Sequence, residues 1–216
     1  MEIAIIGAGN VGTALAIGLT QAGHNVTISA GQPEHAQEVA RAAGARAATS
    51  NGDAVRNAEL VILAVPFTAA PEVVGQLGDA LGGKVVVDAT NQLSSDYSQL
   101  DRWDLSAAER IQARSAAPVV KAFNTTFAVD MPTGRAGDAQ LDGYFAGDDA
   151  QAKTLVAQLL GQLGFRPIDA GGLVMARVLE GMALLNIALQ SRYGWPWQSG
   201  FRLVGPTSVT EATAAA

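Results

Sequence analysis

Residues 2–16 read EIAIIGAGNVGTALA, a short apolar run that breaks into the pattern GxGxxG and continues directly as a helical pattern. In such a strand–turn–helix, Gly7 permits the tight turn, Gly9 lets the backbone approach a pyrophosphate, and Gly12 lets the helix lie close to the strand. The free N–H groups at the helix N-terminus would hold the phosphates. Without this context, GxGxxG would indicate only a glycine-rich turn. We therefore expect a dinucleotide to be bound by Gly7, Ala8, Gly9, Asn10, Val11 and Gly12.

Composition limits the remaining possibilities. With 216 residues, of which 49% are hydrophobic, the chain can bury one sizeable core and a small appendage. A formal charge of −6 gives no basic surface for nucleic acid or an anionic membrane. Cysteine is absent, which excludes disulfides and thiolate metal sites, and no metal is expected. No signal peptide or membrane span is indicated, so we expect a soluble, cytoplasmic protein.

Strand and helix patterns alternate along the chain. Strands are expected at residues 2–6, 26–29, 60–65, 85–88, 118–123 and 165–168, and helices at 10–22, 33–43, 71–81 and 105–114. A further helix is expected after Tyr144–Gly147, with Asp148 as its N-cap and Gln151 completing a capping box. This alternation predicts an α/β fold with a Rossmann-type doubly wound, mostly parallel sheet.

The C-terminal part has a different pattern. Residues 173–190 form a helix that is apolar nearly all round, with Arg177 and Glu180 expected to pair at i, i+3. Such a helix must be buried, either within its own chain or against a second subunit, and we expect a homodimer. The segment Trp195-Pro196-Trp197 is either a hydrophobic plug or a pocket wall. We divide the chain into a dinucleotide-binding domain (1–170), a C-terminal helix with the tryptophan segment that completes the pocket or the dimer interface (171–204), and a flexible tail (205–216).

Polar and turn-forming residues follow three expected strands. Open α/β sheets bind ligands beyond the carboxyl ends of their strands, at the point where strand order reverses. The alternative is that Pro66 merely ends a strand and that Asn91 and Asn124 cap loops. The candidate ligand contacts at these strand ends are Ala64, Val65, Pro66, Phe67, Ala89, Thr90, Asn91, Asn124 and Thr125.

Five motifs occur in a characteristic order: GAGNVG at 7–12, AVPF at 64–67, VDATN at 87–91, VKAFNT at 120–125 and DAGGL at 169–173. Together they resemble the coenzyme F420-dependent NADP oxidoreductase family, and the KAFNT stretch is also similar to the cytosolic oxidoreductase domain of the Steap metalloreductases. The resemblance implies a nicotinamide lying across the strand ends with a flavin-like or deazaflavin (F420) ring stacked against it. It makes Asn124 and Thr125 candidate contacts to this small-molecule acceptor.

The chain departs from the family pattern in two places. The family typically has histidine at the position of Asn124, which weakens the deazaflavin assignment. After the second strand, Ser29-Ala30-Gly31-Gln32 offers neither an acidic residue for a ribose 2′-hydroxyl nor an arginine for a 2′-phosphate. NAD and NADP both remain open. We favour NADP slightly, because no carboxylate would repel the phosphate and Ser29 or the backbone near Ala30 and Gly31 could donate to it.

Hydride transfer between two rings requires alignment more than an acid–base residue, because the cofactors carry the chemistry. We therefore name no catalytic acid or base. Lys121 is the one candidate cation in the central strands, but its alternation with Val119 and Phe123 could equally make it a stem buried against the sheet with its head at the surface, so we do not assign it as catalytic. Asp88 is interpreted as a loop cap. The alternatives to an NAD(P)H-dependent flavin or deazaflavin oxidoreductase are a short dehydrogenase or reductase of a small imine or hydroxy acid, and a non-catalytic dinucleotide-sensing module.

Overall fold

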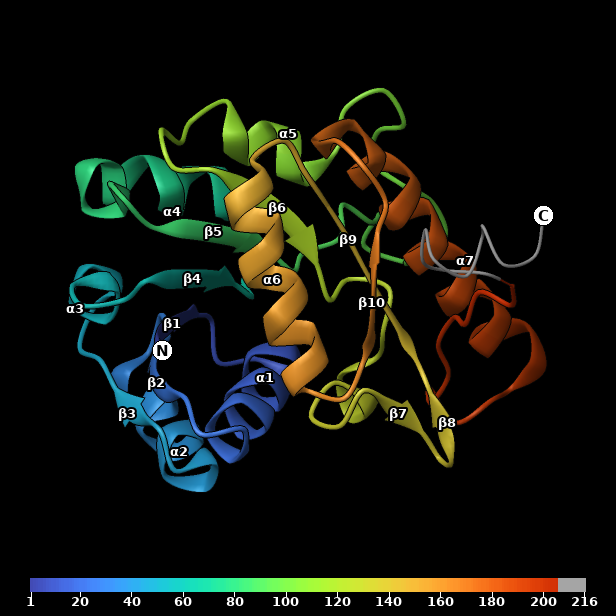
Figure 1. Cartoon of the computed structure of the whole chain (residues 1–216), viewed down its shortest axis with the longest axis horizontal. Coiled ribbons are helices and arrows are strands. Elements are labelled where there is room, and N and C mark those ends of the chain that lie inside the picture. Colours follow the sequence, from blue (N-terminus) through green and yellow to red (C-terminus); the bar gives the residue numbers. More distant parts are fainter. Residues whose placement is uncertain (206–216) are drawn as a thin grey trace.

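A computed structural model describes residues 1–205, and the core of this part of the chain is one twisted sheet (Figure 1). Its strands are ordered β10-β9-β6-β5-β4-β1-β2-β3. Strand β9 pairs antiparallel with β6, β10 runs parallel to β9, and all other pairs are parallel. The predicted doubly wound, mostly parallel fold is confirmed. The strands are β1 (Glu2–Ile6), β2 (Asn25–Ser29), β3 (Arg46–Ala47), β4 (Leu60–Leu63), β5 (Val85–Asp88), β6 (Val119–Ala122), β9 (Asp142–Gly147) and β10 (Arg166–Asp169).

Helices cover both faces of the sheet. One core cluster joins it to α1 (Asn10–Gln21), α2 (Pro33–Ala43) and α6 (Ala150–Gln162). The other joins it to α3 (Asn51–Val55), α4 (Ala70–Leu77), α5 (Ala107–Gln112) and the start of α7 (Ala176–Tyr193). Because successive side chains of a strand point to opposite faces, Ile3 and Ile5 enter the first cluster while Ala4 and Ile6 enter the second. This explains why the central strands are continuously apolar.

Short elements complete the fold. The 3-10 turns are η1 (Gly78–Leu81), η2 (Ala128–Asp130) and η3 (Leu173–Met175), and a small hairpin joins β7 (Arg135–Ala136) to β8 (Ala139–Gln140). Strand β3, helix α3, the hairpin and the reversed direction of β9 were not predicted from the sequence. Two- to five-residue elements carry too few residues for a periodic pattern, and strand direction has no local signature.

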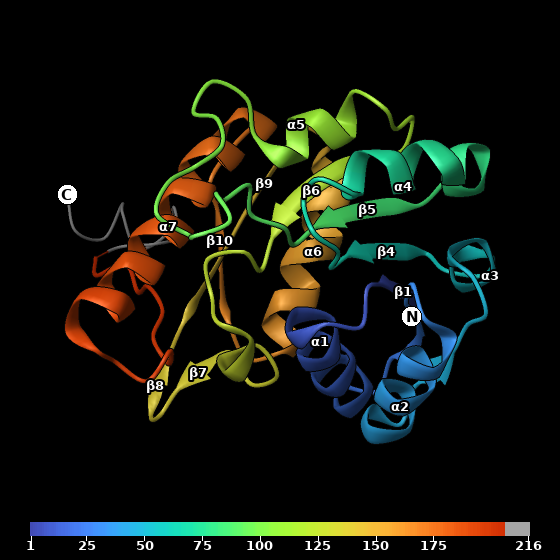
Figure 2. The same cartoon turned by 180° about the vertical axis from the view of Figure 1, so that it is seen from behind.

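Helix α7 lies at the end of the sheet opposite α2 and α3, beside α5 (Figures 1 and 2). Of the two expected alternatives, complete burial of its apolar side chains within its own chain is excluded. Val178 and Leu185 are each 51% exposed, whereas the side chains of Glu180, Asn186 and Gln190 are buried. Polar side chains of α7 therefore face the protein, and an exposed apolar strip that includes Val178 and Leu185 faces away from it.

The segment Leu173–Tyr193 is long and apolar enough to span a membrane by length and composition alone, with a mean hydropathy of 1.4. Within its 18-residue apolar window, 39% is buried inside the protein. Its buried polar side chains bond to the body of the domain, as described below.

Residues after α7 return to the sheet at the start of β9. Asp142 N–H donates to the Phe201 carbonyl (2.9 Å), and the Leu203 N–H donates to the Asp142 carboxylate (2.5 Å). Arg166 holds the same carboxylate through two hydrogen bonds of 2.6 and 2.9 Å. This segment is thus pinned to the sheet, while residues 206–216, most of the tail predicted to be flexible, lie outside the described residues.

Two predicted local contacts are wrong. The N-cap of α6 is Asp149, whose carboxylate accepts from the Ala152 N–H (2.7 Å), one residue later than expected. Asp148 instead accepts from the Leu173 N–H (2.8 Å) and so anchors the start of the C-terminal helix. Arg177 does not pair with Glu180 but with Glu109 on α5, through two bonds of 2.8 and 2.6 Å. In each case a tertiary contact replaced the local one.

Candidate active site

The glycine loop between β1 and α1 has an open backbone where a phosphate could approach. A Cβ on Gly7, which has φ +113°, would lie 2.3 Å from the Ala64 carbonyl oxygen, and one on Gly12 would lie 1.9 Å from the Gly7 carbonyl oxygen. A Cβ on Gly9 would meet no protein atom within 4 Å. No side chain caps the N-terminus of α1. Packing therefore explains Gly7 and Gly12, whereas the space above Gly9 and the bare helix terminus suit an anionic ligand.

The end of β2 has no charged side chain of either sign between Ser29 and Pro33. Ser29 is fully buried, and its hydroxyl donates to the Asn51 side-chain oxygen (2.8 Å). Its carbonyl accepts from the Gly7 N–H (2.9 Å), which joins β2 to the glycine loop. A Cβ on Gly31 would meet no atom within 4 Å. A ligand at this position would meet the backbone around Ala30 and Gly31 more readily than the Ser29 hydroxyl.

The end of β4 lies next to the glycine loop, and the end of β5 lies beside that of β4. The Ala64 N–H donates to the Ile6 carbonyl (2.8 Å), and Val65 and Phe67 are partly exposed beyond it. The Phe67 ring lies 6.0 Å from the Arg110 guanidinium of α5, which places this ring toward the helix layer. After β5, Ala89 and Thr90 are buried and Asn91 is partly exposed.

Asn91 and Asn124 form a mutual clamp across the ends of β5 and β6. The Asn124 amide donates to the Asn91 side-chain oxygen (2.9 Å) and to the Leu179 carbonyl of α7 (3.0 Å). The Asn91 amide donates in return to the Asn124 backbone carbonyl (3.1 Å). Asn124 is 4% exposed, and its side-chain oxygen has no partner among the described residues. That oxygen can accept a hydrogen bond from a ligand.

A cavity of about 360 Å³ opens at this clamp. It lies between the start of α1, the loops that follow β5 and β6, and α7. Its lining is Asn10, Val11, Asn91, Tyr97, Asn124, Thr125, Thr126, Phe127, Ala128, Ala183, Asn186, Ile187 and Trp197.

Backbone strain gathers around the cavity. Among residues 1–205, the non-glycine residues with positive φ are Tyr97 (58°), Phe123 (68°) and Trp197 (55°). Tyr97 and Trp197 line the cavity, and Phe123 immediately precedes Asn124. Such conformations cost about 1–3 kcal/mol each and persist where the surrounding structure enforces them, most often at ligand sites.

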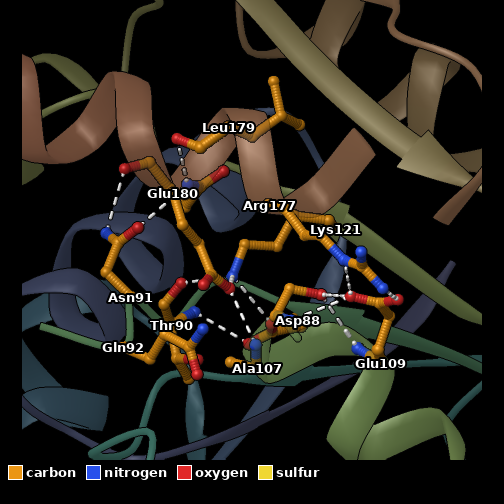
Figure 3. A network of polar contacts seen from close by, with 12 residues as sticks. Asp88, Thr90, Asn91, Gln92, Ala107, Glu109, Lys121, Arg177, Leu179 and Glu180 are labelled. Atoms are coloured by element: carbon orange, nitrogen blue, oxygen red, sulfur yellow. Dashed lines mark hydrogen bonds and ion pairs between the residues drawn. The ribbon is translucent and has the colours of Figure 1, made fainter. Parts of the chain in front are cut away.

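Directly beneath the clamp lies a buried ionic network (Figure 3). The Lys121 ammonium bonds to the carboxylates of Asp88 and Glu180, each at 2.8 Å, and to the Thr90 carbonyl at 2.5 Å. All three charged side chains are fully buried. Glu180 also accepts from the Ala107 N–H (3.0 Å). The network ties β5, β6, α5 and α7 together, so it fixes the loop that carries Asn91.

Burial and charge oppose each other in this network. Burial alone would lower the pKa of Lys121, but the two carboxylates outweigh it and the pKa lies above its usual value. Burial raises the pKa of Glu180, and the attraction of Lys121 only partly offsets this. The Lys121 head is therefore a buried charge, which excludes the alternative of a head at the surface. Asp88 does cap its loop as predicted, since it accepts from the Thr90 N–H (2.9 Å).

The structure thus brings together five of the predicted site residues around the cavity: Asn10, Val11, Asn91, Asn124 and Thr125. The others lie in the glycine loop and the start of α1, at the ends of β4 and β5, or at the end of β2. Sequence reasoning missed Tyr97, Phe127 and Asn186, which come from loops and a helix without a motif. The pocket-wall alternative for the tryptophan segment holds for Trp197, which packs edge-on against Phe127 (5.6 Å between centroids). Within residues 1–205, no group of three or more His, Asp or Glu side chains could hold a metal.

Comparisons with known proteins find relatives that match most of the chain. The family model described as NADP oxidoreductase, coenzyme F420-dependent, matches residues 2–92. The F420-dependent NADP reductase of Methanothermobacter marburgensis is 33% identical over 213 residues, covering 89% of this chain and 94% of the relative. A crystal structure of a candidate F420-dependent NADP reductase from Arthrobacter sp. FB24 superposes with a TM-score of 0.86 at 30% identity, covering 94% of this chain and 99% of that one. The metalloreductase STEAP3 of Rattus norvegicus is 30% identical, and the match covers 85% of this chain but 36% of that protein.

Proposed function

Because the chain belongs to the family of F420-dependent NADP reductases and is an oxidoreductase, we propose that it transfers a hydride between NADP and a flavin or deazaflavin ring in the cavity between α1 and α7. The observation that supports this most directly is the meeting of three features at one place. These are the bare N-terminus of α1, the Asn91–Asn124 clamp with its unpartnered oxygen, and the apolar wall of Phe127 and Trp197.

In this proposal, the dinucleotide lies across the carboxyl ends of the strands. The backbone of Gly9, Asn10 and Val11 would hold the pyrophosphate, and the backbone of Ala30 and Gly31 would hold the adenosine ribose. The free oxygen of Asn124 would accept a hydrogen bond from the nicotinamide carboxamide or from the acceptor ring. Ala64, Val65, Ala89 and Thr90 form the floor between these two ends.

The cofactors would supply the redox chemistry, and the chain would supply binding and alignment. No side chain that lines the cavity in the described structure is an acid or a base at neutral pH. The Lys121 network sits behind the clamp and does not line the cavity. Its role in this proposal is to hold Asn91 and α7 in register with the bound rings.

We also propose a homodimer. The exposed strip of α7, together with Trp103, surrounds an apolar depression of about 620 Å³. Trp103 is 64% exposed, and Val174 and Leu185 are more than half exposed. A contiguous apolar patch of this kind is typical of a subunit contact.

The test of function is anaerobic NADPH and NADH oxidation with F420, FMN and FAD offered separately, combined with binding titrations of NADP and NAD. The proposal expects turnover with at least one of these rings and tighter binding of NADP than of NAD. Turnover of imines or hydroxy acids without turnover of any ring would contradict it, as would dinucleotide binding without any turnover.

A further inference from the structure

Two aromatic residues at the candidate active site share three features. Tyr97, in the loop after β5, and Trp197, in the segment after α7, both line the cavity at the Asn91–Asn124 clamp. Both have a positive φ, of 58° and 55° respectively. Tyr97 is 60% exposed and Trp197 is 47% exposed. A positive φ is costly for an aromatic residue, and burial in a core does not explain it here.

Polar side chains hold Tyr97 in its strained turn. The Asp96 carboxylate accepts from the Ser94 hydroxyl (2.6 Å) and from the hydroxyl and the N–H of Ser98 (2.8 and 3.1 Å). The Ser94 hydroxyl oxygen accepts from the N–H groups of Ser98 and Gln99, each at 3.2 Å. The Tyr97 N–H donates to the Ser94 carbonyl (2.9 Å). The turn that carries Tyr97 is therefore fixed although it is exposed to solvent.

Amides of α7 hold Trp197 in a similar way. The Trp197 N–H donates to the Gln190 side-chain oxygen (2.9 Å), and the Gln190 amide donates to the Ser199 hydroxyl (2.7 Å). That hydroxyl donates to the Asn186 side-chain oxygen (2.6 Å). Gln190 is 1% exposed and Asn186 is 5% exposed, so the contacts that fix Trp197 are buried.

The chain itself does not cover these two rings. Among residues 1–205, no aromatic ring packs against Tyr97, and Phe127 is the one aromatic ring that packs against Trp197. Half-exposed rings stabilise the free protein little, but they offer flat apolar surfaces at the cavity to a ligand. Aromatic side chains prefer planar π systems as partners, through offset stacking or edge-to-face contact. A planar heterocycle therefore suits this pair of residues.

We infer that Tyr97 and Trp197 bind the ring of the acceptor and take no part in binding NADP. The inference rests on the proposed function and deepens it, because it assigns the acceptor subsite to two residues. The expected dinucleotide contacts come from the glycine loop and the ends of β2, β4 and β5, whereas Tyr97 and Trp197 belong to other segments. Substitution of either aromatic residue should therefore separate ring binding from dinucleotide binding.

Glycine variants remove each ring without straining the backbone. Glycine adopts a positive φ freely, so Tyr97→Gly and Trp197→Gly allow both segments to keep their conformation. Tyr97→Phe and Trp197→Phe retain an aromatic ring. Oxidised F420 and oxidised FMN are the probes, each titrated with protein in the presence of NADP⁺ so that no reduction occurs. Binding of each probe is followed by its fluorescence anisotropy, and NADP⁺ binding is measured by calorimetry.

The glycine variants should raise the dissociation constant of the ring that wild-type protein binds about three- to tenfold, as expected for loss of an aromatic contact. The phenylalanine variants should stay within two-fold of wild type. NADP⁺ affinity should stay within two-fold in all four variants. The urea midpoint of Tyr97→Gly should be unchanged or raised, because the lost side chain is mostly exposed and the strain at this residue is relieved.

Tyr193→Ala and Trp195→Ala are matched controls. Tyr193 is 57% exposed and Trp195 is 45% exposed, close to the values for Tyr97 and Trp197. The control residues stack on each other (5.0 Å between centroids) and do not line the cavity. Their loss should leave ring affinity within two-fold of wild type.

The outcomes separate this inference from the proposed function. If wild-type protein binds and reduces a ring, but either glycine variant binds that ring as tightly as wild type, the inference is wrong and the proposed function stands. A fall in NADP⁺ affinity in either glycine variant, or an equal loss of ring affinity in the controls, would also overturn the inference alone. If wild-type protein neither binds nor reduces F420 or FMN, the proposed function fails and the inference fails with it.

Discussion

A substitution at Gly9 should change ligand affinity while leaving the stability of the fold nearly unchanged. Its Cβ would meet no protein atom within 4 Å, and its φ of −75° with ψ of −168° is open to any L-residue. Gly9→Val should therefore lower the free energy of unfolding by no more than about 1 kcal/mol, the effect of a poorer helix N-cap. The same side chain would stand where the pyrophosphate must approach the backbone, so NADP affinity should fall at least tenfold, about 1.4 kcal/mol.

Gly12→Ala is the contrasting variant. Its Cβ would lie 1.9 Å from the Gly7 carbonyl oxygen, so α1 must shift away from β1. We expect a loss of about 1–3 kcal/mol in unfolding free energy, as for an overpacked core. Urea denaturation measures stability, and isothermal titration calorimetry measures NADP affinity. A stable Gly9→Val protein with undiminished affinity would refute the placement of the dinucleotide, and an undamaged Gly12→Ala protein would refute the packing argument.

Three further predictions concern other parts of the molecule. Ala30→Asp should lower the ratio of NADP to NAD affinity, measured by titration, because a carboxylate there would bond a ribose hydroxyl and repel a 2′-phosphate; an unchanged ratio would show that Ala30 is not at the ribose. Met182→Glu places a charge in the apolar depression of α7 and should lower the mass seen by light scattering from dimer to monomer; an unchanged mass would exclude this face as the interface. Lys121→Met leaves Asp88 and Glu180 as buried charges without a counter-ion and should remove about 3–5 kcal/mol of stability in urea. The pKa of Lys121 in the folded protein lies above its usual 10.5, so its contribution to wild-type stability should be full below pH 10.5 and should be lost as the pH rises through the folded-state pKa. Lys121→Met should lack this loss. An equal loss of stability in both proteins would assign the pH dependence to other groups.

The repeating part of the fold was predictable because its signals are local. The glycine loop, the buried strands β4 and β5, and helix α2 each occupy a run of residues with its own periodicity, and their bounds match to within two residues. The direction of β9 was not predictable, since Asp142–Gly147 pairs antiparallel with β6 through contacts distant in sequence.

The site was only partly predictable for the same reason. Strand ends converge by topology, so Asn91 and Asn124 could be placed together from the order of the strands. Their mutual hydrogen bonds, the Leu179 carbonyl that completes the clamp, and the apolar wall of Phe127 and Trp197 depend on how α7 and the following segment pack. Lys121 shows the limit most clearly. Its sequence neighbours are compatible with a surface head, and only the convergence of Asp88 and Glu180 makes its burial possible.

The proposed reaction is hydride transfer from a nicotinamide to a planar ring held in the α1–α7 cavity. Deuterium transfer tests it directly, because the carbon that receives the hydride in a 5-deazaflavin does not exchange its hydrogen with water. NADPH carrying deuterium at C4 of the nicotinamide, on the transferred face, is incubated anaerobically with 5-deazariboflavin and the enzyme, and the reduced ring is analysed by mass spectrometry. Direct hydride transfer should place one deuterium in the reduced ring and give a slower rate than with unlabelled NADPH. A reduced ring without deuterium from either labelled face, or no reduction of the ring at all, would contradict it.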